Sequence, residues 1–177
     1  MNINKSNGFT LIELLIVVAI IGIIAAIAVP GLMRARMSGN EASAIGSIRT
    51  INTSQATFAS SCGGGGYGAS LTVLSTQPTA GGPTFIPADL AAADTSGGAG
   101  TPKSGYGFVA TGVGATVMAQ AATCNNVANS QVQYFATAAP TTAGTTGTRF
   151  FATDHSGMIR QDSSVPIADI TDGIPLQ

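Results

Sequence analysis

Several residue types that carry chemistry are scarce in this 177-residue chain. It has no tryptophan, one histidine and two cysteines, and only 8% of its residues are charged. Seven lysines and arginines against eight acids leave a formal net charge of −1, with no basic run. Nucleic acid is therefore not an indicated partner, because binding its phosphates needs clustered cations. So few charges would endanger the solubility of a free monomer, but they are less surprising in a polymer that buries much of each subunit.

The sequence also lacks a convergent set of catalytic residues. The glycine run at 63–68 has no Lys-Ser/Thr end, so it resembles a phosphate-binding loop only in its glycines. Asp154, His155 and Ser156 are consecutive, and three consecutive residues in a tight turn cannot line up as orienting group, base and nucleophile. A hairpin loop with Gly157 at a positive-φ position is the expectation there. We predict that the protein is not an enzyme.

Metal ligands are equally sparse. Two cysteines and one histidine match no zinc spacing. Carboxylates in loops can bind calcium, but the aspartates near the C-terminus match no EF-hand-like spacing. We expect no cofactor, and we prefer solvated loop carboxylates to calcium, which stays open as an alternative. These aspartates are Asp154, Asp162, Asp169 and Asp172.

What the chain does have is a long apolar run near its N-terminus. Between Phe9 and Val29 the polar side chains are Thr10 and Glu13. A helix of this length spans about 31 Å, roughly the hydrocarbon thickness of a membrane. A glutamate in such a span costs about 2.5–3.5 kcal/mol unless it is neutralised. We therefore expect a membrane-spanning helix and a partner for Glu13.

The N-terminal motif is specific. A polar leader with Lys5, the run Gly8-Phe9-Thr10-Leu11-Ile12-Glu13, and an apolar helix ending at Val29-Pro30 together resemble the N-terminus of type IV prepilins and of the related type II secretion pseudopilins. The resemblance is strong over residues 5–36 and fades beyond them.

The resemblance implies a role for each motif residue. A prepilin peptidase and methyltransferase would cleave after Gly8 and methylate the new N-terminus at Phe9. The Glu13 carboxylate would pair with the Phe9 amine of a neighbouring subunit and so drive filament assembly. The helix between Gly22 and Pro30 would partly unwind in the filament. Pro30 also predicts a kink on local grounds, because it removes a backbone donor.

The rest of the chain predicts an α+β fold. We expect a leader at 1–8, a long N-terminal helix at 9–60 and a β head with Gly/Thr-rich loops at 61–177. Within the helix, residues 9–29 would form the membrane or filament-core segment and residues 30–60 an amphipathic half packed on the head. Apolar residues recur there at helical spacing, at Ile45, Ile48, Ile51 and Phe58.

The head is expected to contain a small antiparallel sheet, which gives the pilin-like lollipop shape that the resemblance implies. Proline at four positions between 78 and 102 excludes any long element there. We predict a short helical turn at 88–93 and about four strands, drawn from 106–110, 113–119, 131–138, 149–153 and 158–161.

Cys62 and Cys124 are the two cysteines of the chain. In an exported protein an even pair most simply means one disulfide, and two buried thiols remain the alternative. A loop of about sixty residues closed in this way would contribute about 4 kcal/mol. The position departs from the usual pilin pattern, in which the disulfide often closes a loop near the C-terminus.

Three functions fit the sequence. The first is a structural subunit of a type IV pilus (a fimbrium for adhesion or twitching motility), whose partners would be copies of itself, other pilins and the inner-membrane assembly platform. The second is a pseudopilin of a type II secretion system. The third is a signal-anchored periplasmic domain of unknown activity. The precursor would span the inner membrane once with its N-terminus in the cytoplasm, and the assembled form would lie outside the cell or in the periplasm.

The hypothesis that the N-terminal segment is an ordinary secretory signal peptide is weaker. Ala26-Ile27-Ala28 fits a small-x-small cleavage site after an apolar core. Glu13 near the start of that core argues against it, and so does the helical pattern that continues past Pro30.

Overall fold

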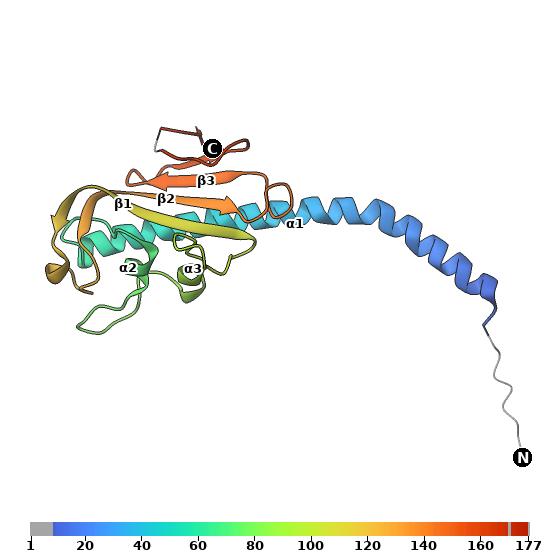
Figure 1. Ribbon diagram of the computed structural model, residues 1–177, viewed down its shortest axis with the longest axis horizontal. Coiled ribbons are helices and arrows are strands. Elements are labelled where there is room, and N and C mark those ends of the chain that lie inside the picture. Colours follow the sequence, from blue (N-terminus) through green and yellow to red (C-terminus); the bar gives the residue numbers. More distant parts are fainter. Residues whose placement is uncertain (1–8, 170, 177) are drawn as a thin grey trace, which may run out of the picture. The chain divides into compact units, whose positions relative to one another are not determined.

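The computed structural model describes residues 9–169 and 171–176. These residues form two compact units, one ending at Arg36 and one starting at Met37. The fold is α+β, with a long apolar N-terminal helix followed by a small antiparallel sheet (Figure 1). This confirms the predicted fold class.

Helix α1 runs from Leu11 to Ser61 and contributes to both units. Its first half contains mostly strong helix formers and β-branched apolar residues, which a membrane environment accommodates. Pro30 lies inside the helix. An interior proline removes one backbone hydrogen bond, yet α1 is continuous on both sides of it. The helix ends where the sequence changes to a glycine run after Cys62.

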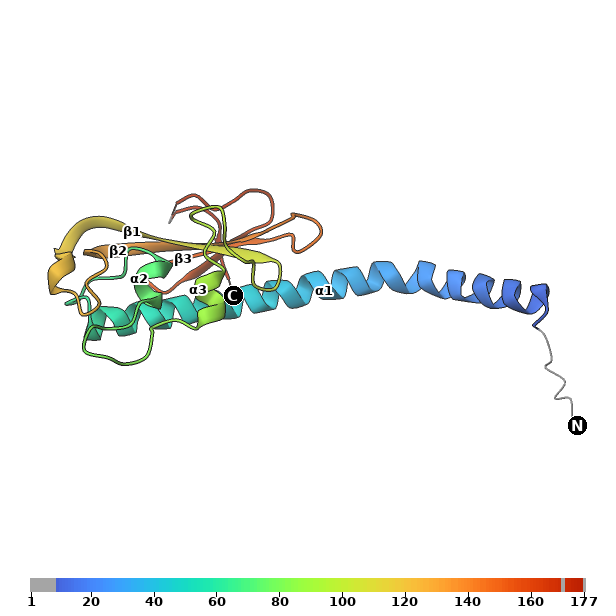
Figure 2. The same ribbon diagram turned by 60° about the horizontal axis from the view of Figure 1, so that its bottom comes forward.

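The sheet has five strands in the order β1-β2-β3-β4-β5, and each strand is antiparallel to its neighbours. Each strand therefore pairs with the next one in sequence, so short connections suffice. In both views the sheet lies along the C-terminal half of α1 (Figures 1 and 2). The strands are β1 Tyr106–Met118, β2 Ser130–Pro140, β3 Phe150–Asp154, β4 Ile159–Asp162 and β5 Ile174–Pro175.

Strand β1 is longer than the sequence patterns indicated. The two short segments expected at 106–110 and 113–119 form one strand, which pairs with β2 from Tyr106↔Pro140 to Met118↔Ser130. Register shifts between Val113 and Met118 interrupt the alternation of side chains. Gly114, at φ +87°, lies inside this irregularity and adopts the backbone conformation that it requires. The bulge therefore explains why the pattern alone suggested two strands.

Strands β3 and β4 form a hairpin around residues 155–158. Gly157 takes a positive φ of 75° in its turn, as the sequence predicted. The Asp154 carboxylate accepts a hydrogen bond from the Ser156 amide at 2.7 Å, which tightens the same turn.

Three short helices occupy the connections. Helix α3, Ala88–Ala92, matches the predicted turn, whereas α2, Leu71–Ser75, and the 3-10 helix η1, Gln120–Ala122, were not predicted. Ser70 caps α2 by accepting a hydrogen bond from the Val73 amide.

The core of the second unit lies between α1 and the sheet. It is built from apolar side chains of α1, of α2 and α3, and of the inner face of the sheet. Burial of each large side chain contributes about 1.5–3 kcal/mol. The largest fully buried side chains are Tyr106, Phe58, Phe108, Phe151, Ile48, Ile51, Leu71, Leu74, Ile86, Leu90, Gln55 and Val73.

The segment between β4 and β5 covers part of the other face of the sheet. Ile167 from this segment is buried, and so is Ala152 of β3. The sheet is thus covered on both faces over part of its width, which explains why β3 contains several buried residues in a row.

Candidate functional site

The start of α1 is held by a reciprocal contact between Thr10 and Glu13. The Thr10 amide and hydroxyl donate to Glu13 Oε2 at 2.9 and 2.6 Å, and the Glu13 amide donates to Thr10 Oγ1 at 3.3 Å. This is a capping box, which satisfies amides that the first helical turn leaves free. Within the described residues, Glu13 Oε1 accepts no hydrogen bond. The cap therefore orients the carboxylate and leaves one oxygen for a further donor.

Phe9 directly precedes this cap. It is 85% exposed and lies outside the helix. Gly8, on the other side of the predicted cleavage point, lies outside the described residues. Cleavage after Gly8 and methylation of Phe9 therefore stay predictions.

The first unit presents an apolar surface on all sides of α1. Among the described residues, α1 is the one helix long and apolar enough to cross a membrane, and none of its most apolar stretch is buried. Leu11 is 80% exposed and Ile27 77%. A helix that is apolar all round needs an apolar partner, either lipid or other helices.

Gly22 and Pro30 both lie within the continuous helix α1. A Cβ atom added at Gly22 would meet no atom within 4 Å beyond the adjoining helix backbone and its two chain neighbours. The unwinding predicted between these residues concerns an assembled filament, and it stays a prediction.

In the second unit, Glu41 of α1 binds the segment before β3. Glu41 is 6% exposed. Its Oε1 accepts hydrogen bonds from the Thr148 amide and hydroxyl at 2.8 and 2.9 Å. Its Oε2 accepts from Arg149 Nε and forms an ion pair with Arg149 Nη2, both at 2.8 Å. The Arg149 guanidinium also lies over the Phe151 ring, 5.3 Å from its centroid. The buried charge is thus fully paired, as its burial requires.

Burial by itself raises the pKa of the Glu41 carboxyl, but the hydrogen bonds from Thr148 and Arg149 and the charge of Arg149 outweigh that effect. The pKa of Glu41 therefore lies below its ordinary value, and the group is ionised at neutral pH.

Two further polar residues of α1 also contact the rest of the head. The Asn52 Oδ1 atom accepts hydrogen bonds from the Tyr134 hydroxyl at 2.7 Å and from the Thr153 hydroxyl at 2.9 Å. The Gln55 amide exchanges two hydrogen bonds with the Gly68 backbone, at 2.9 and 2.7 Å. These residues interrupted the apolar pattern in the sequence, which gave no indication that they anchor the head. The spacing 41, 44, 48, 51, 55 and 58 places Glu41 and Gln55 on one face with the buried apolar residues, and this was the signal that could have located these two; Asn52 is half-buried and lies outside that series.

Cys62 and Cys124 form a disulfide, as predicted, with their Cα atoms 4.8 Å apart. The bond joins the end of α1 to the loop that follows η1. Within the described residues no cysteine is free. The helix is thus fixed to the head by Glu41 near its entry and by Cys62 at its end.

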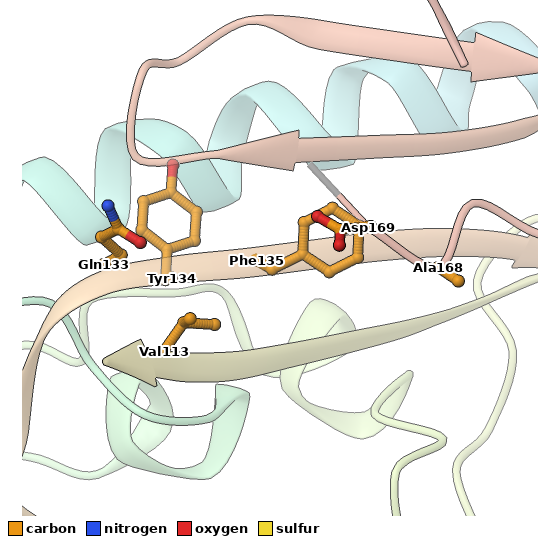
Figure 3. A pocket seen from close by; sticks show the side chains of 6 residues that line it. All are labelled: Val113, Gln133, Tyr134, Phe135, Ala168 and Asp169. Atoms are coloured by element: carbon orange, nitrogen blue, oxygen red, sulfur yellow. The ribbon is translucent and has the colours of Figure 1, made fainter. Parts of the chain in front are cut away.

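The outer face of the sheet carries a pocket of about 220 Å³ under the segment that follows β4 (Figure 3). Its described lining contains no histidine, cysteine or serine, and its ionisable groups are the Asp169 carboxyl and the Tyr134 hydroxyl. Its lining therefore offers no pair of nucleophile and base. The lining residues are Val113, Gln133, Tyr134, Phe135, Ala168 and Asp169.

The described residues also contain no group of three or more His, Cys, Asp or Glu that could hold a metal ion. Asp162 Oδ1 accepts hydrogen bonds from the Ser164 amide and hydroxyl, both at 2.7 Å. These hydrogen bonds hold the pKa of Asp162 below its ordinary value. Asp172 Oδ2 accepts a hydrogen bond from the Asp169 amide at 3.2 Å. The structure thus brings no calcium ligand set together from these aspartates.

Comparison with known proteins identifies the N-terminal segment. Residues 3–29 match the model of the prokaryotic N-terminal methylation motif. The matched region includes Thr10, Glu13 and the apolar start of α1.

Two curated relatives also match the chain. The chain is 45% identical over 54 residues to the type IV major pilin protein PilA of Myxococcus xanthus, which covers 30% of this chain and 24% of the relative. It is 57% identical over 37 residues to the type IV wide pilus major component PilA4 of Thermus thermophilus, which covers 21% of this chain and 28% of the relative. The matches thus span about a quarter of the length of these relatives. No solved structure matches the chain.

Proposed function

We propose that this chain, whose methylation motif and relatives support the type IV pilin family, is a structural subunit of a type IV pilus. The two relatives are by name pilus components. In our proposal the subunit has a structural rather than an enzymatic role, and it polymerises through α1 after the leader at 1–8 has been removed.

The observation that carries this proposal is the apolar surface of α1 with one oriented carboxylate at its start. The surface is exposed throughout the first unit. Glu13 has one oxygen without a donor in the described chain, and a new amine at Phe9 of a neighbour would supply the missing positive charge. A charge pair in a dry bundle is costly to break, so Glu13 would fix the register of neighbouring helices.

The proposal includes a membrane stage. Before assembly, α1 would span the inner membrane with the leader on the cytoplasmic side, where Lys5 agrees with the positive-inside rule. The partners would then be a prepilin peptidase and methyltransferase, an inner-membrane assembly platform, and other copies of the chain.

A pseudopilin is the second candidate. The position of the disulfide favours it, because that position departs from the usual pilin pattern. Cys62–Cys124 ties the end of α1 to the loop after η1, whereas the C-terminal segment carries no disulfide. We nevertheless favour the pilus, because a Gly- and Thr-rich head with a disulfide suits exposure outside the cell.

The test is electron microscopy of material sheared from cells that express the chain, with antibodies against the head, beside cells in which the gene is deleted. A pilus subunit predicts labelled fibres in the sheared fraction that the deletion removes. Label confined to the cell envelope would point to a pseudopilin, and absence from both fibres and periplasmic filaments would contradict a filament role.

A further inference from the structure

The few charges of this chain are unevenly distributed between its two units. The second unit, from Met37 onward, carries four cations and seven carboxylates, a formal balance of −3 with the histidine neutral. The described part of the first unit carries Glu13 near its start and two arginines near its end. The chain therefore has a cationic segment on α1 and an acidic head.

The cationic segment consists of Arg34 and Arg36. Both side chains are exposed, and within the described residues no carboxylate lies within ion-pair distance of either. Residues two apart on a helix point about 200° apart, so the two guanidinium groups extend from opposite sides of α1. They also follow directly on the apolar surface that ends near Met33.

Among the described residues, Asp169 and Asp172 are the exposed carboxylates of the head that form no ion pair. The other acids of the head are paired, buried or half-buried. Asp94 and Asp162 are half-buried and accept turn hydrogen bonds from the Ser96 and Ser164 amides. Glu41 is paired with Arg149, and Asp89 with Lys103 at 2.9 Å. Asp154 is buried in its hairpin turn.

We infer that Arg34 and Arg36 of one subunit, which extend from opposite sides of α1, bind the exposed aspartates Asp169 and Asp172 on the heads of two neighbouring copies. The inference rests on the proposed filament function and names the polar part of its interface. It follows from charge complementarity, because each copy has two exposed arginines in the first unit and two exposed aspartates in the second that form no ion pair within the described chain.

The geometry of such a contact favours a fibre over a closed dimer. Because the two guanidinium groups extend from opposite sides of α1, they reach two different neighbours, whereas the reciprocal contact of a two-fold dimer involves one neighbour. Each copy that binds a neighbour through its arginines still presents its own aspartates to another. Heterologous contacts that do not close generate open helical assemblies.

Both partners of each pair are exposed in the single chain, so one contact in water would be weak. In a filament the contact repeats at every subunit next to an apolar interface, and electrostatic complementarity there selects the register and rejects mismatched neighbours.

The test is a charge swap in the full-length chain, expressed in its own cells. The variants are Arg34→Asp with Arg36→Asp, Asp169→Arg with Asp172→Arg, and all four together. The amount of chain in sheared fibres and in membranes is measured for each. We expect each double variant to lower the fibre fraction at least about tenfold, because the substitution places like charges together at every repeat of the contact. The fourfold variant should return to within about threefold of the wild type.

A mismatched swap serves as control. Arg49 is exposed on the same helix, and adding Arg49→Asp to the Asp169→Arg, Asp172→Arg chain should not restore fibres. If Arg49→Asp restored the fibres, the inference would be overturned, because the fibre level would then depend on the net charge of the chain and not on contacts made by Arg34 and Arg36. Wild-type fibre levels in either double variant would overturn it too. Loss without rescue in the fourfold variant would also overturn it and indicate that the arginines bind lipid headgroups instead. Absence of wild-type fibres would instead contradict the proposed pilus function.

Discussion

Two glutamates on α1 have opposite surroundings. Glu13 lies on an exposed apolar surface with one oxygen held by Thr10, whereas Glu41 is buried and accepts hydrogen bonds with both oxygens. The first is therefore available to a partner, and the second is used within the head. We therefore expect Glu13 to act in filament assembly and Glu41 to stabilise the folded head.

Glu13→Ala should abolish fibres while leaving the chain in the membrane. The substitution removes the only carboxylate of the apolar segment, so a neighbour's N-terminal amine would remain unpaired in a dry interface. The measurement is quantitative immunoblotting of sheared and membrane fractions. Thr10→Val, which removes the hydroxyl of the cap but keeps the carboxylate, is the matched control and should reduce fibres less. Normal fibre levels with Glu13→Ala would contradict the assigned role.

Glu41→Ala should destabilise the head by about 1–3 kcal/mol, because it removes the acceptor of the Thr148 amide and hydroxyl and leaves the partly exposed Arg149 without its charged partner. Urea unfolding of the full chain in detergent micelles, followed by near-UV circular dichroism, measures this loss. Asp89→Ala breaks the exposed ion pair with Lys103 and should change stability little. Equal effects of the two substitutions would refute the anchoring role of Glu41.

The stabilising effect of Glu41 should depend on pH. The pKa of this carboxyl is lower in the folded state than in the unfolded chain. Its contribution is therefore fully present above the unfolded value of about 4.3 and is lost as the pH falls through the folded value. Comparing the unfolding free energy of the wild type and Glu41→Gln between pH 7 and pH 3 tests this. We expect the gap between them to narrow in acid, and a constant gap would contradict the shift.

At the scale of elements, the disulfide is the strongest constraint on the end of α1. It closes a sequence separation of 62 residues, for which the chain-entropy model gives about 4 kcal/mol. Cys62→Ser with Cys124→Ser should lower the unfolding free energy by about that amount in the same urea experiment. A loss well below 1 kcal/mol would show that the buried contacts of α1 alone hold the helix to the head.

The elements differ in how far the sequence could predict them. Helix α1 and α3 were predicted because apolar spacing and local composition determine them. The β3–β4 hairpin was predicted because Gly157 has a clear turn role. The single strand β1 was not, because its bulge breaks the alternation on which strand prediction depends. Strand β5 has two residues and forms only through pairing with β4, which no local pattern encodes.

The functional residues also divide into those that a local motif could identify and those that it could not. Gly8, Phe9 and Glu13 were selected from a short motif, and Cys62 and Cys124 from cysteine count alone. Glu41 and Asn52 could not be assigned as anchors, because their partners lie about a hundred residues away in sequence. Long-range polar contacts of this kind depend on the sheet register, which the sequence does not reveal.

At the scale of the whole molecule, α1 joins a unit with an exposed apolar surface to a unit with its own core. An exposed apolar surface of this extent requires lipid or protein to cover it. The proposed function supplies both in turn, with the membrane covering the precursor and neighbouring helices covering the assembled subunit.

The measurement that tests this account most directly is mass spectrometry of the N-terminal peptide in sheared extracellular fibres and in membranes. The account predicts a peptide that begins with methylated Phe9, and predicts it in the sheared fibres. The same peptide confined to membranes would favour a pseudopilin over a pilus subunit. A chain that begins at Val29, or one that keeps Met1, would contradict assembly through α1 altogether.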